Sequence, residues 1–360
     1  MTSGPGSLST AKPGNLLDRV AAGGLLAAGR PVCVLLSGGR DSVCLLDLAV
    51  RIAGTGHVAA LHCDYGLREA SAADAAFCAE LCARLGVELH VERPRRPDAA
   101  HTDAASPPST GTDAASPPST GTDAASPPST GNLQAWARDQ RYAAGARLAL
   151  ARGGDLAAGH TASDQVETVL YRLAASPGRR ALLGMHPRAG RLIRPLLGVS
   201  RAQTAAHCAA RGLAWREDAS NASPAFARNR ARHALLPALR ALHPAAEANV
   251  LRTLDLLRDE AEVLDAVVRE ALATAGDPPR RDALARLPPA VARLALQRLA
   301  DTAAGGTGPA VGHRTDEVLA LPDGGALDLG GGLRAELRAG VLRIGASRGP
   351  AAPRPRQAPA

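Results

Sequence analysis

The fold of this chain is decided by the stretch Val32-Cys33-Val34-Leu35-Leu36-Ser37-Gly38-Gly39-Arg40-Asp41-Ser42. Its first five residues are apolar, as in a strand that is buried on both faces of a parallel sheet. A short turn with two glycines follows, and the pattern predicts a helix that begins near Ser42. Glycines let main-chain N–H groups approach an anion, and a helix N-terminus points its own N–H groups at the same place. The stretch therefore predicts a phosphate cradle at residues 37–42.

The predicted cradle contains no lysine. Loops that grip the terminal phosphates of a nucleotide commonly read G-x-x-x-x-G-K-[ST], and their lysine bridges those phosphates. In this chain Lys12 is the only lysine, and it lies far from the turn. A loop that holds pyrophosphate as a leaving group is therefore favoured, with Asp41 as the expected Mg²⁺ ligand. The alternative is an ordinary strand-to-helix turn with an N-cap.

Composition narrows the class of protein. The chain has 360 residues, 46% of them hydrophobic, which is enough for two or three domains. Its net charge of +8 comes almost entirely from arginine and suits a polyanionic partner, whereas 2% aromatic residues argue against binding single strands by stacking. None of the six cysteines forms a C-x-x-C pair, which argues against a zinc or iron–sulfur site. The sequence shows no signal peptide and no apolar run that would span a bilayer, so we expect a cytoplasmic protein with no membrane partner.

Between residues 32 and 175, short apolar runs alternate with amphipathic stretches. We expect strands at 32–36, 57–63, 87–92 and 156–159, and helices at 42–53, 71–85, 132–152 and 163–175. This alternation predicts an α/β fold in which helices cover both faces of a parallel sheet. Such sheets bind ligands at the carboxyl ends of their strands, so the cradle and the segments after Leu61 and Ala158 should share one edge.

The rest of the chain divides by composition. The expected parts are a sheet domain at 15–215, a helical section at 216–276, a small α+β domain at 277–346, and disordered tails at 1–14 and 347–360. One long helix is expected from Pro244 to Gly276. The α+β domain should hold helices near 281–300 and 312–321 and a β-hairpin around 326–344. Residues 102–131 are three copies of Thr-Asp-Ala-Ala-Ser-Pro-Pro-Ser-Thr-Gly, which predicts a disordered insertion in the sheet domain.

Five segments in a fixed order resemble a known family. Residues 37–42 have the form S-G-G-x-D-S of pyrophosphatase loops. Residues 62–68, 137–142 and 159–168 are similar to H-x-(N/D)-H-G-L-R, A-R-x-x-R-Y and G-H-x-x-D-D-Q-x-E-T, and residues 218–232 are similar to D-x-S-N…R-N-x-I-R. These are motifs of the tRNA(Ile)-lysidine synthases. The resemblance implies the adenine nucleotide α-hydrolase-like PP-loop domain of that family.

The resemblance also implies a two-step reaction. ATP would adenylate the C2 oxygen of the wobble cytidine in the isoleucine tRNA with anticodon CAU, and free lysine would then displace AMP through its ε-amine. ATP and Mg²⁺ are the expected cofactors, and the isoleucine tRNA and lysine are the expected partners; a homodimer is the alternative to a monomer. The residues expected to bind ATP are Ser37, Gly38, Gly39, Arg40, Asp41, Ser42 and His62.

The family motifs and the chemistry together suggest catalytic residues. Asp41 should hold the metal ion, and Arg138 should stabilise charge on the α-phosphate. Attack by lysine needs a neutral amine, so Asp164 should orient the ammonium and accept a proton, with Glu167 one turn away. His160 is expected to hydrogen-bond the nucleotide or the substrate. The residues expected to bind tRNA are Arg228, Asn229 and Arg232.

The sequence departs from the family pattern at several positions. Thr161 and Ser163 stand where many relatives have a histidine and an aspartate, and Tyr65 replaces a common histidine. Ala175 and Ser176 replace an Arg-Gly pair. Loss of a carboxylate at position 163 leaves the base and any second metal ligand open.

Alternatives therefore stand beside each assignment. In the alternative interpretation, Asp164 is only an N-cap of its helix and Arg138 only pairs with a nearby carboxylate. The arginines around residue 230 would then form a solvated basic face. For the whole chain, the alternatives are another PP-loop enzyme that adenylates tRNA, or a degenerate tRNA-binding protein without activity.

Overall fold

The computed structural model describes residues 15–66, 71–94, 133–175, 179–216 and 230–347. They form two compact units, one up to Asp255 and one from Leu256 onward. The expected insertion at 102–131 and both expected tails lie outside the described residues, apart from Ser347. The domain boundaries expected from the sequence remain predictions.

The first unit is built on a six-stranded sheet. The strand order is β3-β2-β1-β4-β6-β5. The strands are β1 (Val32–Leu35), β2 (Val58–Cys63), β3 (Glu88–Glu92), β4 (Asp155–Ala157), β5 (Arg188–Ala189) and β6 (Leu192–Ile193). All neighbours pair in parallel except β5, which runs antiparallel to β6. The predicted α/β class with a mostly parallel sheet is confirmed.

Helices follow the strands as the sequence pattern predicts. The first unit holds α1 (Leu16–Ala22), α2 (Arg40–Ala53), α3 (Ser71–Leu85), α4 (Leu133–Ala151), α5 (Ala162–Ala175), α6 (Arg179–Leu182), α7 (Arg201–Ala210), α9 (Leu236–Leu242) and the start of α10 (Ala246–Ala275). A π-helical turn, Ala231–Leu235, precedes α9. Each of α2 to α5 lies within about two residues of its expected bounds.

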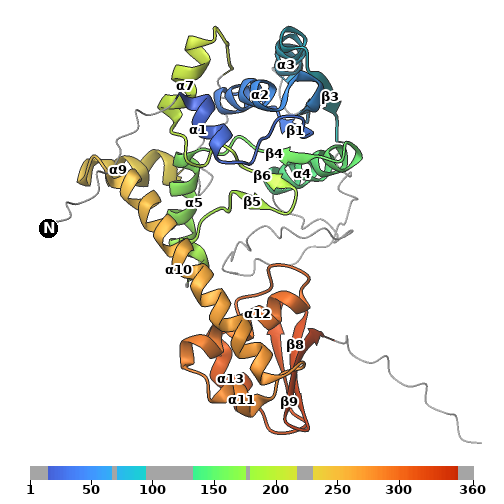
Figure 1. Ribbon diagram of the computed structural model, residues 1–360, viewed down its shortest axis with the longest axis vertical. Coiled ribbons are helices and arrows are strands. Elements are labelled where there is room, and N and C mark those ends of the chain that lie inside the picture. The colour runs from blue at the N-terminus through green and yellow to red at the C-terminus, as the bar shows by residue number, and fades with distance from the viewer. Residues whose placement is uncertain (1–14, 67–70, 95–132, 176–178, 217–229, 348–360) are drawn as a thin grey trace, which may run out of the picture. The chain divides into compact units, whose positions relative to one another are not determined.

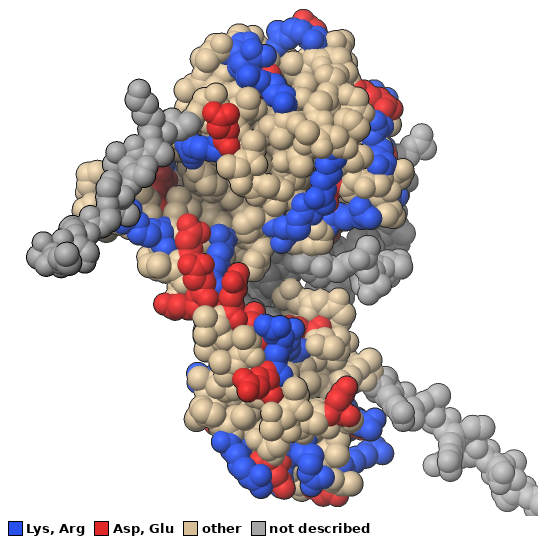
Figure 2. Space-filling view, in the orientation of Figure 1, with Lys and Arg blue, Asp and Glu red and all other residues tan. Residues whose placement is uncertain are grey.

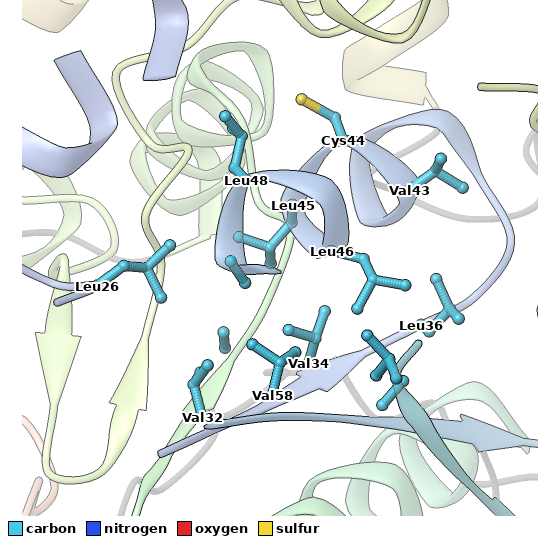
Figure 3. Close-up of a cluster of buried hydrophobic side chains, with 14 of the residues drawn as sticks. Leu26, Val32, Val34, Leu36, Val43, Cys44, Leu45, Leu46, Leu48 and Val58 are labelled. Carbon is cyan, nitrogen blue, oxygen red and sulfur yellow. The ribbon is translucent and has the colours of Figure 1, made fainter. Parts of the chain in front are cut away.

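Side chains alternate between the two faces of β1. Val32 and Val34 join the buried cluster beneath α2, where Leu45 and Leu46 pack over them (Figure 3). Cys33 and Leu35 point the other way, into a cluster that includes α4. The helices α1, α2, α3 and α7 contribute to the first cluster, so the sheet is covered on both faces (Figure 1). Both faces of β1 are thus buried, which explains its unbroken apolar run.

A buried polar contact fixes α7 against α2. Nε2 of His207 lies 2.7 Å from Oδ2 of Asp47, whose side chain is 1% exposed. Arg211 Nε approaches the other carboxylate oxygen at 3.5 Å. Because α2 begins at the predicted cradle, this contact sets the N-terminal end of α7 beside the cradle.

The second unit contains the rest of α10, then α11 (Arg281–Ala285), α12 (Pro289–Ala303) and α13 (Thr315–Leu319). Its antiparallel sheet consists of β7 (Ala326–Gly330), β8 (Leu333–Arg338) and β9 (Val341–Ala346). The helix expected at 281–300 is two helices, since Pro288 and Pro289 remove backbone donors between them. The expected hairpin is a three-stranded meander, with a second turn at Ala339 and Gly340, both at positive φ.

Charge is distributed unevenly along the chain. Between residues 256 and 347, aspartate and glutamate outnumber arginine. Figure 2 shows acidic side chains grouped where α10 runs, and the sequence there contains Asp259, Glu260, Glu262 and Asp265. The net charge of +8 therefore comes from the rest of the chain, which points to that part for contact with a polyanion.

Candidate active site

The turn between β1 and α2 is held open by serine hydroxyls. The hydroxyl of Ser42 donates to the carbonyl of Gly39 at 2.8 Å and accepts from the N–H of Ser37 at 3.3 Å. Gly38 has φ +80°, and a Cβ there would lie 3.3 Å from the Phe77 ring, so glycine is required. Among the described residues, no side chain caps the N-terminus of α2. The first N–H groups of α2 thus remain available to an anion, which favours the cradle over the capped turn.

Asp41, in the first turn of α2, is oriented by two residues of α7 and its neighbour in sequence. The hydroxyl of Thr204 donates to Asp41 Oδ1 at 2.6 Å, and Arg40 Nε donates to the same oxygen at 3.2 Å. Arg201 Nε lies 4.0 Å from Oδ2. Sequence reasoning missed Thr204 and Arg201. The capping box of Ser200 and Gln203, an S-x-x-Q signature, is the signal that would have located their helix.

Asp164 lies in the first turn of α5. Its Oδ2 accepts the N–H of Thr161 at 2.8 Å and the Thr161 hydroxyl at 2.9 Å. Burial acts to raise the pKa of Asp164, but the Thr161 hydrogen bonds and the charge of Arg201 prevail and hold that pKa below its usual value. Thr161, not Asp164, stands at the N-cap position, and Asp164 takes the third position of the helix, as in a capping box.

A second arginine spans Asp164 and the carboxylate one turn later. Arg232 Nε donates to Glu167 Oε1 at 2.7 Å, and its terminal nitrogen donates to Glu167 Oε2 and to Asp164 Oδ1, each at 3.0 Å. Arg201 also approaches Asp164 Oδ1, at 3.4 Å. We call Asp164 and Glu167 the acidic pair. Arg201 links it to Asp41, so the cradle and the acidic pair belong to one network.

Two histidines lie at the carboxyl edge of the sheet. His62 is 5% exposed, and its Nδ1 lies 2.9 Å from the carbonyl of Leu36, so Nδ1 is the donor in this contact. His160 follows β4, and its buried Nδ1 has no hydrogen-bond partner among the described residues. Burial lowers the pKa of His160 to about 3; Asp164 opposes this, and the charges of Arg194 and Arg138 add to it. At neutral pH the imidazole is uncharged.

Arg138 is placed by the N-terminal half of α4. Its guanidinium lies over the ring of Tyr142, 4.8 Å from the centroid. The hydroxyl of Tyr65 donates to the carbonyl of Ala137 at 2.6 Å, and the Tyr65 ring meets Trp136 edge to face at 5.9 Å. Tyr65, a departure from the family pattern, thus ties the loop after β2 to the turn of helix that carries Arg138.

The structure brings some of the residues expected in the site into direct contact with one another. Asp41, Asp164, Glu167 and Arg232 share one network of ion pairs, whereas Arg228 and Asn229 lie outside the described residues. Arg232 was expected to contact tRNA and here holds the acidic pair; its contact with tRNA remains a prediction. Ser163 is 5% exposed and contributes no charge. In the part of the chain that the structure describes, no three His, Cys, Asp or Glu side chains converge as a metal site.

Comparisons with known proteins identify the family. A family model described as a PP-loop domain matches residues 15–239. The tRNA(Ile)-lysidine synthase of Symbiobacterium thermophilum is 40% identical over 72% of this chain and 51% of its own length. That of Gloeobacter violaceus is 35% identical over 76% of this chain and 78% of its own length. The chain belongs to the tRNA(Ile)-lysidine synthase family.

The family resemblance of the five sequence segments is therefore confirmed. The chain spans about half the length of the Symbiobacterium synthase. Among solved structures, the U34-tRNA thiolase NcsA of Methanococcus maripaludis is similar, at 17% identity over 67% of this chain and 77% of that chain, with a TM-score of 0.49. Among the described helices of this family member, none has the length and apolar character needed to cross a membrane.

Proposed function

We propose that the chain is an ATP-dependent ligase that joins free lysine to C2 of the wobble cytidine in the isoleucine tRNA with anticodon CAU. In the first step the C2 oxygen attacks the α-phosphorus of ATP, and pyrophosphate leaves. In the second step the ε-amine of lysine attacks C2, and AMP leaves. The observation that carries the proposal is Arg201, which approaches both Asp41 and Asp164 and so joins a phosphate cradle to an acidic pair.

The cradle suits the departure of pyrophosphate. N–H groups at the start of α2 would stabilise the negative charge that develops on the leaving group. Mg²⁺ commonly binds one or two protein carboxylates and completes its shell with substrate phosphates and water. Asp41 fits that role, since its carboxylate lies at the cradle and stays partly exposed. A bound Mg²⁺ would neutralise phosphate charge, while Arg138 is assigned to the α-phosphate.

The acidic pair suits a cationic amine. It already accepts one cation, because the guanidinium of Arg232 donates to both carboxylates. The lowered pKa of Asp164 keeps this carboxylate ionised at neutral pH, which favours orienting the lysine ammonium. The acidic pair would only relay the proton that the amine loses before attack, because a carboxylate with a lowered pKa is too weak a base to keep it. A tRNA phosphate that binds Arg232 would draw it away from the acidic pair and leave the pair free to bind the lysine ammonium. Arg232 would thus couple tRNA binding to lysine binding.

The test is lysine transfer by the purified chain. Radiolabelled lysine, ATP and Mg²⁺ are incubated with a transcript of the isoleucine tRNA, and label in tRNA is followed together with pyrophosphate and AMP. We expect one pyrophosphate and one AMP for each lysine incorporated, and no label in a transcript whose wobble cytidine is uridine. Asp41→Asn should abolish pyrophosphate release, while Asp18→Asn, an exposed carboxylate on α1, should behave as the wild type. Pyrophosphate release without label in the tRNA would mean that another nucleophile is used. If neither pyrophosphate nor labelled tRNA forms, the chain would be a tRNA-binding protein without this activity.

A further inference from the structure

Arg194, directly after β6, is a buried cation that has no counter-ion among the described residues. Only 6% of this residue's surface is exposed. One terminal nitrogen donates to the carbonyl of His186 at 2.7 Å, but the buried Nε has no hydrogen-bond partner among the described residues. No described carboxylate forms an ion pair with it. Burial lowers the pKa of Arg194; Tyr142 opposes this, and the positive charges of Arg138 and Arg172 add to it.

The sheet register places Arg194 at the edge that carries the site. Ala157 of β4 pairs with Ile193 of β6, and the N–H of Ala158 donates to the Ile193 carbonyl at 3.0 Å. Arg194 and the segment leading to His160 therefore leave neighbouring strands in the same direction. The unpartnered Nδ1 of His160 and the unpartnered Nε of Arg194 are thus two buried donor or acceptor atoms at one edge.

A structural role explains only one hydrogen bond of the Arg194 side chain and not its buried charge. The segment 184–186 is held by three side chains: Arg172 donates to Gly184 O at 2.8 Å, Gln165 bonds both backbone groups of Met185, and Arg194 donates to His186 O. A neutral carbonyl satisfies one of the five N–H groups of a guanidinium and none of its charge. Because Arg194 itself is buried, its charge is unfavourable there unless an anion compensates it.

We propose that Arg194, together with Arg138, forms a phosphate-binding subsite at the end of β6, distinct from the cradle at residues 37–42. The ligand is a phosphate ester, since a guanidinium fork matches two phosphate oxygens and is always charged. The proposal rests on the proposed function for the source of that ester: the α-phosphate of ATP, or a backbone phosphate of the bound tRNA. Neutral His160 follows the neighbouring strand β4 at the same edge of the sheet and would hydrogen-bond the same group.

The test compares Arg194→Gln with Arg191→Gln. Arg191 lies next to β6, in the turn from β5, and donates to the carbonyl of Gly154 at 2.9 Å, so both variants lose one positive charge and one bond to a carbonyl. Binding of inorganic phosphate and AMP is measured by calorimetry, and tRNA binding by filter retention, all at one salt concentration. We expect Arg194→Gln to weaken the binding of AMP, of tRNA or of both by about tenfold or more, as the loss of charged hydrogen bonds predicts. The affinities of Arg191→Gln should stay within about twofold of those of the wild type.

Thermal unfolding separates this role from a structural one. Inorganic phosphate should raise the melting temperature of the wild type and of Arg191→Gln, and it should raise that of Arg194→Gln much less. A residue that only holds the segment 184–186 would lower the melting temperature equally with and without phosphate. If Arg194→Gln does not fold, Arg194→Lys decides, because it keeps the charge and a donor for His186 but loses the fork; its AMP or tRNA affinity should still fall several-fold.

The outcomes assign the source of the phosphate. Weaker AMP binding with unchanged tRNA binding assigns the α-phosphate, and the reverse assigns the tRNA backbone; either supports the subsite. The proposal is overturned if phosphate, AMP and tRNA bind the Arg194 variants as they bind the wild type, or if the wild type binds none of them. These measurements need no lysine transfer, so a chain that fails to make lysidine still gives a result on the subsite.

Discussion

Arg232 lies across the acidic pair, 2.7 Å from Oε1 of Glu167 and 3.0 Å from Oδ1 of Asp164. Glu167 is almost fully buried, with 4% of its side chain exposed, while Arg232 keeps 20% of its side chain exposed. The arginine thus neutralises a carboxylate that water does not reach. It also occupies the place that we assign to the lysine ammonium, so the stability of the free chain and its affinity for substrate depend on the same contact.

Arg232→Gln should destabilise the chain because it leaves the Glu167 charge buried without a partner. Removing one member of a buried ion pair costs about 3–5 kcal/mol, and partial exposure of Arg232 reduces this to about 2 kcal/mol. Adding Glu167→Gln should recover part of that loss. Urea unfolding of both single variants and the double variant measures the coupling, expected at about 1 kcal/mol or more. Additive effects of the two substitutions would show that the contact contributes no stability of its own.

His160 should make stability depend on pH in the acid range. The pKa of His160 is lowered to about 3 in the folded chain, whereas an unfolded histidine titrates near 6.5. The unfolded state therefore binds the extra proton first, and stability should be fully present above about pH 6.5 and fall as the pH drops from there toward the folded value, by up to about 1.4 kcal/mol per pH unit. In His160→Gln the urea midpoint should depend less on pH between about pH 6.5 and pH 4.5 than it does in the wild type. His57→Gln, on the 3-10 turn before β2, serves as a control. Equal slopes in wild type and His160→Gln would contradict the lowered pKa of His160.

The sequence predicts the elements with long apolar periods and misses the short ones. The helices α2 to α5 and the strands β1 to β3 lie within about two residues of their expected bounds. The strands β5 and β6 have two residues each, too few to show a period, and Arg194 was overlooked with them. The cradle was expected from its own glycine-containing turn, and the acidic pair from the family motif at residues 159–168 together with the strand edge that carries it. Arg201 and Thr204 were not expected, because only the tertiary contact of α7 with α2 brings them to Asp41.

Tyr65 is expected to position Arg138. Its hydroxyl donates to Ala137 O at 2.6 Å, one residue before Arg138. Tyr65→Phe should cost about 1 kcal/mol of stability and, if Arg138 acts on the α-phosphate, should lower the rate of pyrophosphate release several-fold with little change in the KM for lysine. Tyr171→Phe on α5 removes a phenol hydroxyl elsewhere and should leave both quantities unchanged. A Tyr65→Phe variant that loses stability but keeps the wild-type rate would limit Tyr65 to a structural role.

Thr204 is expected to orient the carboxylate of Asp41 for the metal ion. Its hydroxyl is fully buried and donates to Asp41 Oδ1 at 2.6 Å while also contacting the carbonyl of Arg201. Thr204→Val keeps the shape but removes the donor, whereas Thr204→Ser keeps the donor and loses a methyl group. Pyrophosphate release should therefore fall about tenfold in Thr204→Val and require a higher Mg²⁺ concentration for half-maximal rate, while Thr204→Ser should respond to Mg²⁺ as the wild type does. An unchanged Mg²⁺ dependence in Thr204→Val would mean that Asp41 keeps its orientation through Arg40 and Arg201 alone, and that Thr204 serves only to pack α7 against α2.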